Sequence, residues 1–237
     1  MSEPVIVARG LRVTRGGKTI LRGVDIEAHA GEVLGVLGPS GAGKSTLFRA
    51  LVGEEPPDQG TVWLEGRDVT RHPLWMRARA GMGYMPQGPS VLWELSVGDN
   101  LAAFRHIAGV SERTPRITAA RVGLEERLGV RAGELSGGER RRLELARAIT
   151  RAPKVLVCDE PFAGVDPAGA ERLGILLREL AGGGTAVLLA DHHVSEALRV
   201  CTRAVLLLDG LVAASAPASE FADQPLVRGR YLGTLGM

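Results

Sequence analysis

The sequence GEVLGVLGPSGAGKST, residues 31–46, decides the fold of this chain. Its first part, Glu32 to Leu37, is a nearly continuous apolar run, which is typical of a strand buried on both faces of a parallel sheet. The next residues, Gly38 to Ser45, match the pattern G-x-x-x-x-G-K-[ST], which functions between such a strand and a helix. We therefore expect an α/β protein in which a helix begins near Lys44.

The loop from Gly38 to Ser45 is suited to binding phosphate. Its glycines let backbone N–H groups face phosphate oxygens, and the N-terminus of the following helix adds a favourable dipole. In this pattern Lys44 reaches the β- and γ-phosphates, and the Ser45 hydroxyl holds Mg²⁺. The alternative is a chance glycine-rich turn before a lysine, but the four fixed positions match in only roughly 0.5% of sequences of this composition. The expected nucleotide contacts are Gly38, Pro39, Ser40, Gly41, Ala42, Gly43, Lys44, Ser45 and Thr46.

The composition excludes several other classes of protein. Among 237 residues, 29 basic and 27 acidic side chains give a net charge of +2, without the excess of positive charge that marks a nucleic-acid-binding domain. The two cysteines, Cys158 and Cys201, are too few for a disulfide framework and fit a reducing compartment. We find no apolar run of membrane-spanning length and no secretion signal at residues 1–4. We expect a soluble intracellular protein.

A second segment, which is acidic, indicates that the bound nucleotide is hydrolysed. Residues 155–160 read VLVCDE, a buried strand that ends in two carboxylates. Asp159 can hold a Mg²⁺ shell through water, and Glu160 can polarise the attacking water. The alternative, a strand capped by two surface acids, is common in proteins but loses weight once a phosphate loop precedes it.

A third segment, LSGGE at residues 135–139, precedes a basic helix over residues 140–151. A serine and two glycines at a helix start form another N-terminus able to bind an anion. The alternative is an ordinary N-cap followed by flexible glycines. We expect a nucleotide contact from the whole segment, Leu135, Ser136, Gly137, Gly138 and Glu139.

The pattern of the chain predicts two kinds of architecture within a single domain, residues 4–237. Short β segments divided by turns such as Arg15-Gly16-Gly17 open the chain, and strands alternate with helices again after residue 150. We assign 4–87 and 151–237 to a mostly parallel sheet flanked by helices, together with an N-terminal antiparallel β part. Residues 88–150 lack strand-like runs and are expected to form a helical subdomain. Its predicted apolar face consists of Ile117, Ala120, Leu124 and Leu128.

These segments together resemble the ATP-binding cassette family, and the resemblance covers nearly all of residues 5–233. It implies an ATPase with a phosphate-loop NTPase core whose cofactors are ATP and Mg²⁺. Glu160 is then the catalytic base, His192 contacts the γ-phosphate, and Gln87 senses the γ-phosphate. Taken singly, Gln87 would be an ordinary amide at a strand end, and His192 a hydrogen-bonded histidine after a strand.

The resemblance also implies a homodimer. Two chains pair head to tail, so that each ATP lies between the phosphate loop of one and residues 136–138 of the other. Asp166 lies in the loop that makes contact across this dimer. The Mg²⁺ ion is implied to be held by Ser45 and Gln87, and by Asp159 through water.

Further partners follow from the family. Transmembrane permease subunits are expected to contact the region from Gln87 to Asp99, while nucleic acid and the cargo do not touch the chain. The resemblance places the protein in the cytoplasm, peripheral on the cytoplasmic face of the bacterial inner membrane.

Within the family, the strings EPFAGVDP at 160–167, Asp191-His192 and YLG at 231–233 are most similar to ATPases of lipopolysaccharide export. Branched-chain amino-acid importers share some of these features and are the alternative. A soluble cassette ATPase in DNA repair or translation is a remote alternative, because this chain has one cassette and a near-neutral charge.

Three positions depart from the family pattern. Arg15 stands where an aromatic ring often stacks on adenine, and a guanidinium plane can also stack. The segment Leu92-Trp93-Glu94 replaces a typically basic groove, and Trp93 is equally interpretable as a partner anchor or as a half-buried core ring. His193 replaces the usual asparagine.

Overall fold

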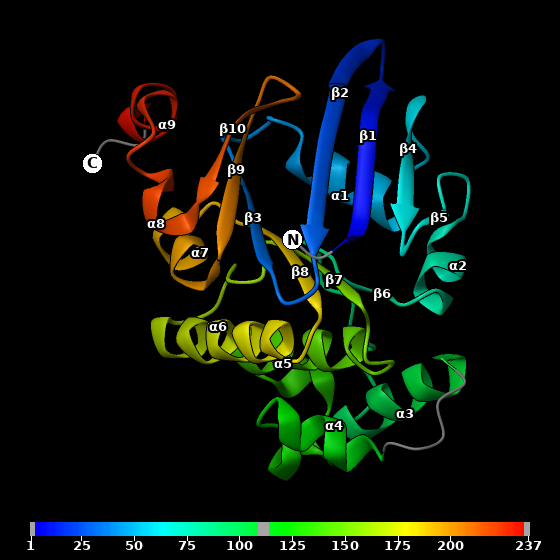
Figure 1. Ribbon diagram of the computed structural model, residues 1–237. Coiled ribbons are helices and arrows are strands. Elements are labelled where there is room, and N and C mark those ends of the chain that lie inside the picture. Colours follow the sequence, from blue (N-terminus) through cyan, green and yellow to red (C-terminus); the bar gives the residue numbers. More distant parts are fainter. Residues whose placement is uncertain (1–2, 109–113, 235–237) are drawn as a thin grey trace.

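The computed structural model describes residues 3–108 and 114–234, whose strands form two sheets (Figure 1). The larger sheet has the order β10-β9-β3-β8-β7-β6 and the smaller has the order β2-β1-β4-β5. Within the described ranges, no helix is both long enough and apolar enough to cross a membrane. The strands of the larger sheet are β3 (Val33–Leu37), β6 (Met82–Met85), β7 (Val155–Asp159), β8 (Ala186–Ala190), β9 (Arg203–Leu208) and β10 (Leu211–Pro217).

The larger sheet is parallel except at one edge, where β10 pairs antiparallel with β9. Its central strands β3, β7 and β8 are buried on both faces. Leu34 and Val36 face the core shared with the smaller sheet, whereas Val33 and Leu37 face the core shared with the helices. The near-continuous apolar run is therefore explained by burial on both sides.

The smaller sheet is antiparallel and consists of β1 (Pro4–Arg15), β2 (Lys18–His29), β4 (Gln59–Leu64) and β5 (Arg67–Asp68). We expected several short segments in this region, but β1 and β2 are continuous twelve-residue strands joined at the predicted turn. Shifts in their register absorb the interrupted apolar pattern. Helix α1 (Lys44–Val52) packs Leu47, Phe48 and Leu51 into the core between the two sheets.

Helices cover the other face of the larger sheet, as Figure 1 shows for α6. Helix α6 (Pro167–Gly182) buries the leucines at 173, 176, 177 and 180, which repeat at helical spacing, and it ends at Gly182. The remaining helices of this part are α2 (Leu74–Arg79), α7 (Val194–Val200), α8 (Ala218–Phe221) and α9 (Pro225–Arg230).

The described part of residues 88–150 contains α3 (Val97–Ala108), α4 (Pro115–Arg121) and α5 (Gly137–Ala148), and no extended strand. Figure 1 places α3 and α4 at the end of the molecule opposite to the β1–β2 turn. The apolar face predicted here is wrong, because Ile117 is 57% exposed and Ala120 is also exposed. Helix α4 ends before Gly123, which has a positive φ, and so the four positions do not share one helix.

Candidate active site

The phosphate loop joins the end of β3 to the start of α1. Gly43 is the N-cap of α1 with φ 108°, a conformation that favours glycine, and no side chain caps the helix. Because no side chain caps them, the first N–H groups of α1 are available to an anion. The Lys44 ammonium donates to the carbonyl oxygens of Gly38 (2.7 Å) and Pro39 (3.0 Å), so it crosses the mouth of the loop. Burial lowers the pKa of Lys44, and the carboxylates of Glu160 and Asp159 oppose this shift.

Asp159 ends β7 beside the phosphate loop. Its side chain is almost completely buried and shares a hydrogen bond with Ser45. Burial raises the pKa of Asp159, and the nearby Glu160 carboxylate adds to this effect. Its Oδ1 atom has no hydrogen-bond partner among the residues that the structure describes. A buried carboxylate oxygen without a partner, next to a hydroxyl, is the hard oxygen donor set that Mg²⁺ prefers.

Glu160 occupies a backbone conformation that is unusual for a residue with a side chain. Its φ is 51°, in the left-handed region. The structure holds it there from both sides, since its N–H donates to the Ala190 carbonyl (2.7 Å) and its own carbonyl accepts from the Arg141 guanidinium (2.6 Å). The Glu160 carboxylate lies 3.7 Å from Nδ1 of His192. Backbone strain of this kind is concentrated at functional sites.

The phosphate loop, Glu160 and His192 line one open cavity of about 600 Å³, whereas Asp159 lines a neighbouring cavity together with Gln87. Five separate stretches of sequence contribute to the first cavity, namely the β2 strand, the phosphate loop, the segment after β6, the end of β7 and the end of β8. All but one of its lining residues belong to the predicted site, and the exception is Ile20. No local pattern could have identified Ile20, which is one apolar residue within a hairpin. The lining residues are Ile20, Ser40, Gly41, Gly43, Lys44, Ser45, Thr46, Gln87, Glu160 and His192.

Arg15 lies outside this lining. Its guanidinium forms an ion pair with Glu55, in which Nε donates to Oε1 at 2.7 Å. To stack on a base in the cavity, Arg15 would have to release Glu55. The stacking role stays a prediction, and Ile20 is the apolar residue that the structure places at the cavity instead.

The predicted LSGGE segment forms the start of α5 and does not line the cavity. Ser136 is the N-cap, where its hydroxyl accepts from the Glu139 N–H (3.2 Å) and its own N–H donates to the Glu139 carboxylate (2.9 Å). Glu139 is also paired with Arg127, and Leu135 is buried. This capping box explains the serine and the glutamate structurally. It leaves the two glycines unexplained.

One of the two glycines, Gly137, is explained by close packing against the loop that contains Asp166, whereas a Cβ atom on Gly138 would make only ordinary van der Waals contacts. A Cβ atom on Gly137 would lie 2.5 Å from the Gly164 carbonyl oxygen, so only glycine fits without movement. Asp166 itself caps α6, accepting from the Gly169 N–H at 2.8 Å. Gly137 and the Asp166 loop are thus in contact within one chain.

Arg141 of α5 is a site residue that sequence reasoning missed. Its buried guanidinium donates to the carbonyls of Pro86 (3.1 Å) and Glu160 (2.6 Å) and pairs with Glu144 at 2.6 Å. It therefore ties the helical segment to the strand ends on both sides of the cavity. Its spacing of four residues from the buried Leu145 was the available signal, because it places Arg141 on the buried helix face.

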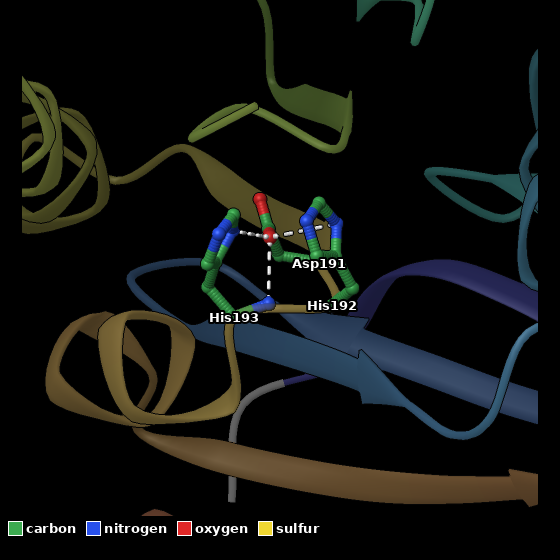
Figure 2. Close-up of side chains that lie close together, drawn as sticks. All are labelled: Asp191, His192 and His193. Atoms are coloured by element: carbon green, nitrogen blue, oxygen red, sulfur yellow. Dashed lines mark hydrogen bonds and ion pairs between the residues drawn. The ribbon is translucent and has the colours of Figure 1, made fainter. Parts of the chain in front are cut away.

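The carboxylate of Asp191, directly after β8, lies next to the imidazoles of the two following residues, His192 and His193 (Figure 2). Asp191 is fully buried, and its Oδ2 accepts from the Phe162 N–H at 3.0 Å. Its Oδ1 accepts from the His193 N–H at 2.9 Å and lies 3.0 Å from His193 Nδ1 and 3.6 Å from His192 Nδ1. Figure 2 shows the two imidazoles on either side of this carboxylate.

The chain is similar in sequence and in fold to known ATP-binding proteins. A family profile described as ABC transporter matches residues 21–163. The chain is 40% identical to the lipopolysaccharide export system ATP-binding protein LptB of Acidithiobacillus ferridurans, over 98% of each protein. It is 39% identical to LptB of Escherichia coli K12, over 96% of this chain and 97% of that protein. A solved ATP-binding cassette of an ABC transporter in its ADP conformation superposes with a TM-score of 0.87 and 26% identity, over 98% of this chain and all of that one. The predicted fold class is confirmed.

Proposed function

The chain belongs to the ATP-binding cassette family of transporter ATPases, and from that premise we propose that it is the ATP-hydrolysing motor of a lipopolysaccharide export complex. The observation that carries the ATPase role is the convergence of Lys44, Gln87, Glu160 and His192 on one cavity beside an uncapped helix N-terminus. The relatives named for lipopolysaccharide export, matched over nearly their full length, support the choice of cargo.

Each site residue has a separate role in the proposed ATP hydrolysis. The phosphate loop and Lys44 bind the β- and γ-phosphates, and Glu160 takes the proton of the attacking water. His192 and Gln87 contact the γ-phosphate from the side of Glu160. Mg²⁺ fits the oxygen donors of Ser45, Gln87 and Asp159, where it would neutralise phosphate charge, and the unpartnered Oδ1 of Asp159 supports this assignment.

Two copies of the chain complete the site. Residues 136–138 of one chain do not line its own cavity, so we place them against the nucleotide of the partner. ATP then favours closure, because its γ-phosphate contacts both chains at once, and hydrolysis removes that bridge.

A groove of about 490 Å³ between α2, β6, α3 and α5 is the proposed contact for a permease subunit. Its rim carries Trp75, which is 56% exposed, and Leu74, while Met82 and Phe104 line it. Such an apolar groove suits a helix inserted side-on. Of the predicted contact region from Gln87 to Asp99, only Ser90 lines this groove. The exposed Trp93 lies nearby on the same segment, where its ring stacks with Arg140 at 4.5 Å.

In this proposal the chain lies at the cytoplasmic face of the bacterial inner membrane, where its permease partners hold it. The cargo does not touch it, because every site residue described above serves ATP or a protein contact. Nucleic acid is not a proposed partner.

The test is to identify the membrane proteins that bind this chain. The tagged chain is purified from gently solubilised host membranes, and co-purifying proteins are identified by mass spectrometry. Exporter-type transmembrane proteins with a periplasmic bridge component are the expected result. Permeases accompanied by a periplasmic amino-acid-binding protein would instead make the chain an importer motor.

A matched pair of variants tests the groove in the same experiment. Trp75→Ala removes the exposed ring at the groove, and Trp63→Ala removes a ring that is 39% exposed on the smaller sheet. We expect the first variant to lose most of the co-purifying permease and the second to retain it. Equal recovery with both variants would contradict the proposed contact.

A further inference from the structure

The cluster of Asp191, His192 and His193 has the spacing of a metal site. Its three donor atoms all lie within 4.8 Å of one another, and the two Nδ1 atoms lie 3.0 and 3.6 Å from Asp191 Oδ1. A tetrahedral ion with bonds of about 2.0–2.1 Å needs ligand atoms about 3.3 Å apart. The observed separations of 3.0 and 3.6 Å from Asp191 Oδ1 bracket this value.

We propose that Asp191, His192 and His193 bind one transition-metal ion of the Zn²⁺ class when no nucleotide occupies the site. Two imidazole nitrogens with one carboxylate favour Zn²⁺, Ni²⁺ or Cu²⁺ over Mg²⁺, which prefers oxygen ligands. The cluster therefore differs in selectivity from the oxygen donors of Ser45 and Asp159. A fourth position remains for water, as in open zinc sites.

The carboxylate of this cluster is already oriented for a ligand. Asp191 is fully buried and both of its oxygens accept a backbone N–H, from Phe162 and from His193. The side chains of His192 and His193 are 56% and 45% exposed, so an ion can enter from solvent. Such outer hydrogen bonds hold ligands in place and raise metal affinity.

The cysteines and the other described side chains of types that bind zinc do not offer a comparable site for the ion. Burial raises the pKa of both cysteine thiols, Cys158 and Cys201, to about 12, so neither is a thiolate at neutral pH. Within residues 3–108 and 114–234, no other group of three histidine, cysteine or acidic side chains gathers in this way.

We expect the bound metal ion to inhibit ATP hydrolysis, an expectation that rests on the proposed function. A metal bound to Nδ1 of His192 holds the imidazole that we assign to the γ-phosphate. Zn²⁺ then inhibits ATP hydrolysis at a constant excess of Mg²⁺. The asparagine usual in the family at position 193 would remove one of the three ligands.

The first experiment measures binding without nucleotide. Tag-free chain is titrated with ZnCl₂ by calorimetry, as the wild type and as the variants His193→Asn and His106→Asn. The control residue His106 is exposed on α3 and lies outside the cluster. We expect one Zn²⁺ per chain, with affinity reduced roughly tenfold or more in His193→Asn and unchanged in His106→Asn. No binding by the wild type, or equal affinity in all three proteins, overturns the proposal.

The second experiment separates the site from its proposed effect. ATPase activity is followed against Zn²⁺ at fixed Mg²⁺ and ATP, each variant relative to its own rate without Zn²⁺. Inhibition of the wild type that is relieved in His193→Asn supports both steps. Calorimetric binding without inhibition would overturn the inhibitory step and the γ-phosphate contact of His192, and the metal site itself would stand.

Discussion

Glu160 combines a strained backbone with a position at the candidate active site. Among the described residues, it is one of four non-glycine residues with a positive φ, and the others are Glu65, Ala152 and Asp209. The strain is compensated by two backbone hydrogen bonds, one to the Ala190 carbonyl and one from Arg141. The result is a carboxylate that lines the cavity and lies 3.7 Å from His192.

We predict that Glu160→Gln lowers ATP turnover by on the order of 10²–10⁴, because the amide cannot accept the proton of water. ATP affinity should be retained, since the phosphate loop is unchanged. Steady-state ATPase assays and calorimetric ATP binding measure the two quantities. Glu65→Gln is the matched control, because Glu65 has a similar φ of 48° and lies outside the cavity. Hydrolysis at the wild-type rate by Glu160→Gln would refute the assignment of the base.

Lys44 is one of only three lysines in the chain, which allows a clean comparison. Its ammonium lies at the loop carbonyls of Gly38 and Pro39, where it can turn toward a bound phosphate. We predict that Lys44→Ala abolishes detectable ATP binding, whereas Lys18→Ala at the exposed β1–β2 hairpin does not. Calorimetric titration with Mg-ATP tests both variants. Unchanged nucleotide affinity in Lys44→Ala would count against the phosphate loop.

At the scale of elements, the C-terminal carbonyls of α1 are capped by an arginine from another helix. Arg77 of α2 is fully buried, and its guanidinium donates to the carbonyls of Ala50 (2.8 Å) and Leu51 (2.6 Å) at the end of α1. It also donates to the Thr70 and His72 carbonyls, both at 2.9 Å. Desolvation lowers the pKa of Arg77 to about 10, so the side chain still carries its charge at neutral pH.

We predict that Arg77→Ala lowers the free energy of unfolding by about 3 kcal/mol, because it leaves several buried carbonyls without donors. Arg79→Ala, in the same helix but exposed, should change it by less than about 0.5 kcal/mol. Urea unfolding followed by circular dichroism compares the two. Equal destabilisation would show that the loss comes from α2 in general and not from the capping of α1.

Helix α5 is the element that connects the helical segment to the active site. Gly137 at its start packs beside the loop that contains Asp166, and the Arg141 guanidinium further along the helix donates to the carbonyls of Pro86 and Glu160. A displacement of α5 would therefore move both the segment leading to Gln87 and the backbone of Glu160. This gives a physical route by which a permease at the neighbouring groove could influence hydrolysis.

At the scale of the whole molecule, the phosphate loop and the start of α5 belong to separate surfaces. The cavity includes no residue from 135–139. We propose that a second chain supplies these residues, so that hydrolysis requires two molecules. The activity should then rise with protein concentration more steeply than linearly.

We predict that Ser136→Arg blocks the ATP-dependent dimer and hydrolysis while a single chain still binds ATP. Thr114→Arg is the matched control, since Thr114 also caps a helix and accepts a backbone N–H. Light scattering with Mg-ATP in the Glu160→Gln background gives the mass of the complex. Dimers of Ser136→Arg equal to those of the control would contradict a nucleotide sandwiched between chains.

The amino-acid sequence by itself predicted the glycine-rich loop before α1, the two carboxylates at the end of β7 and the buried parallel strands. Each of these is a local pattern, because phosphate contact needs glycines beside a lysine, and a central strand needs an unbroken apolar run. The leucines of α6 were predictable for the same reason. The apolar face predicted for residues 117–128 was wrong, since periodicity does not reveal where a helix stops.

Only the tertiary structure decided which distant groups meet. It paired Arg15 with Glu55, placed Ile20 at the cavity and brought Arg141 to the Glu160 carbonyl. These contacts join residues between 19 and 40 positions apart, or residues of different strands, and no short pattern encodes such pairings. The orientation of His193 toward the buried Asp191 carboxylate likewise depends on the distant Phe162 N–H, which donates to that carboxylate. Sequence specified the chemical groups, and long-range packing specified their neighbours, because burial and hydrogen bonding are satisfied only when the whole chain is folded.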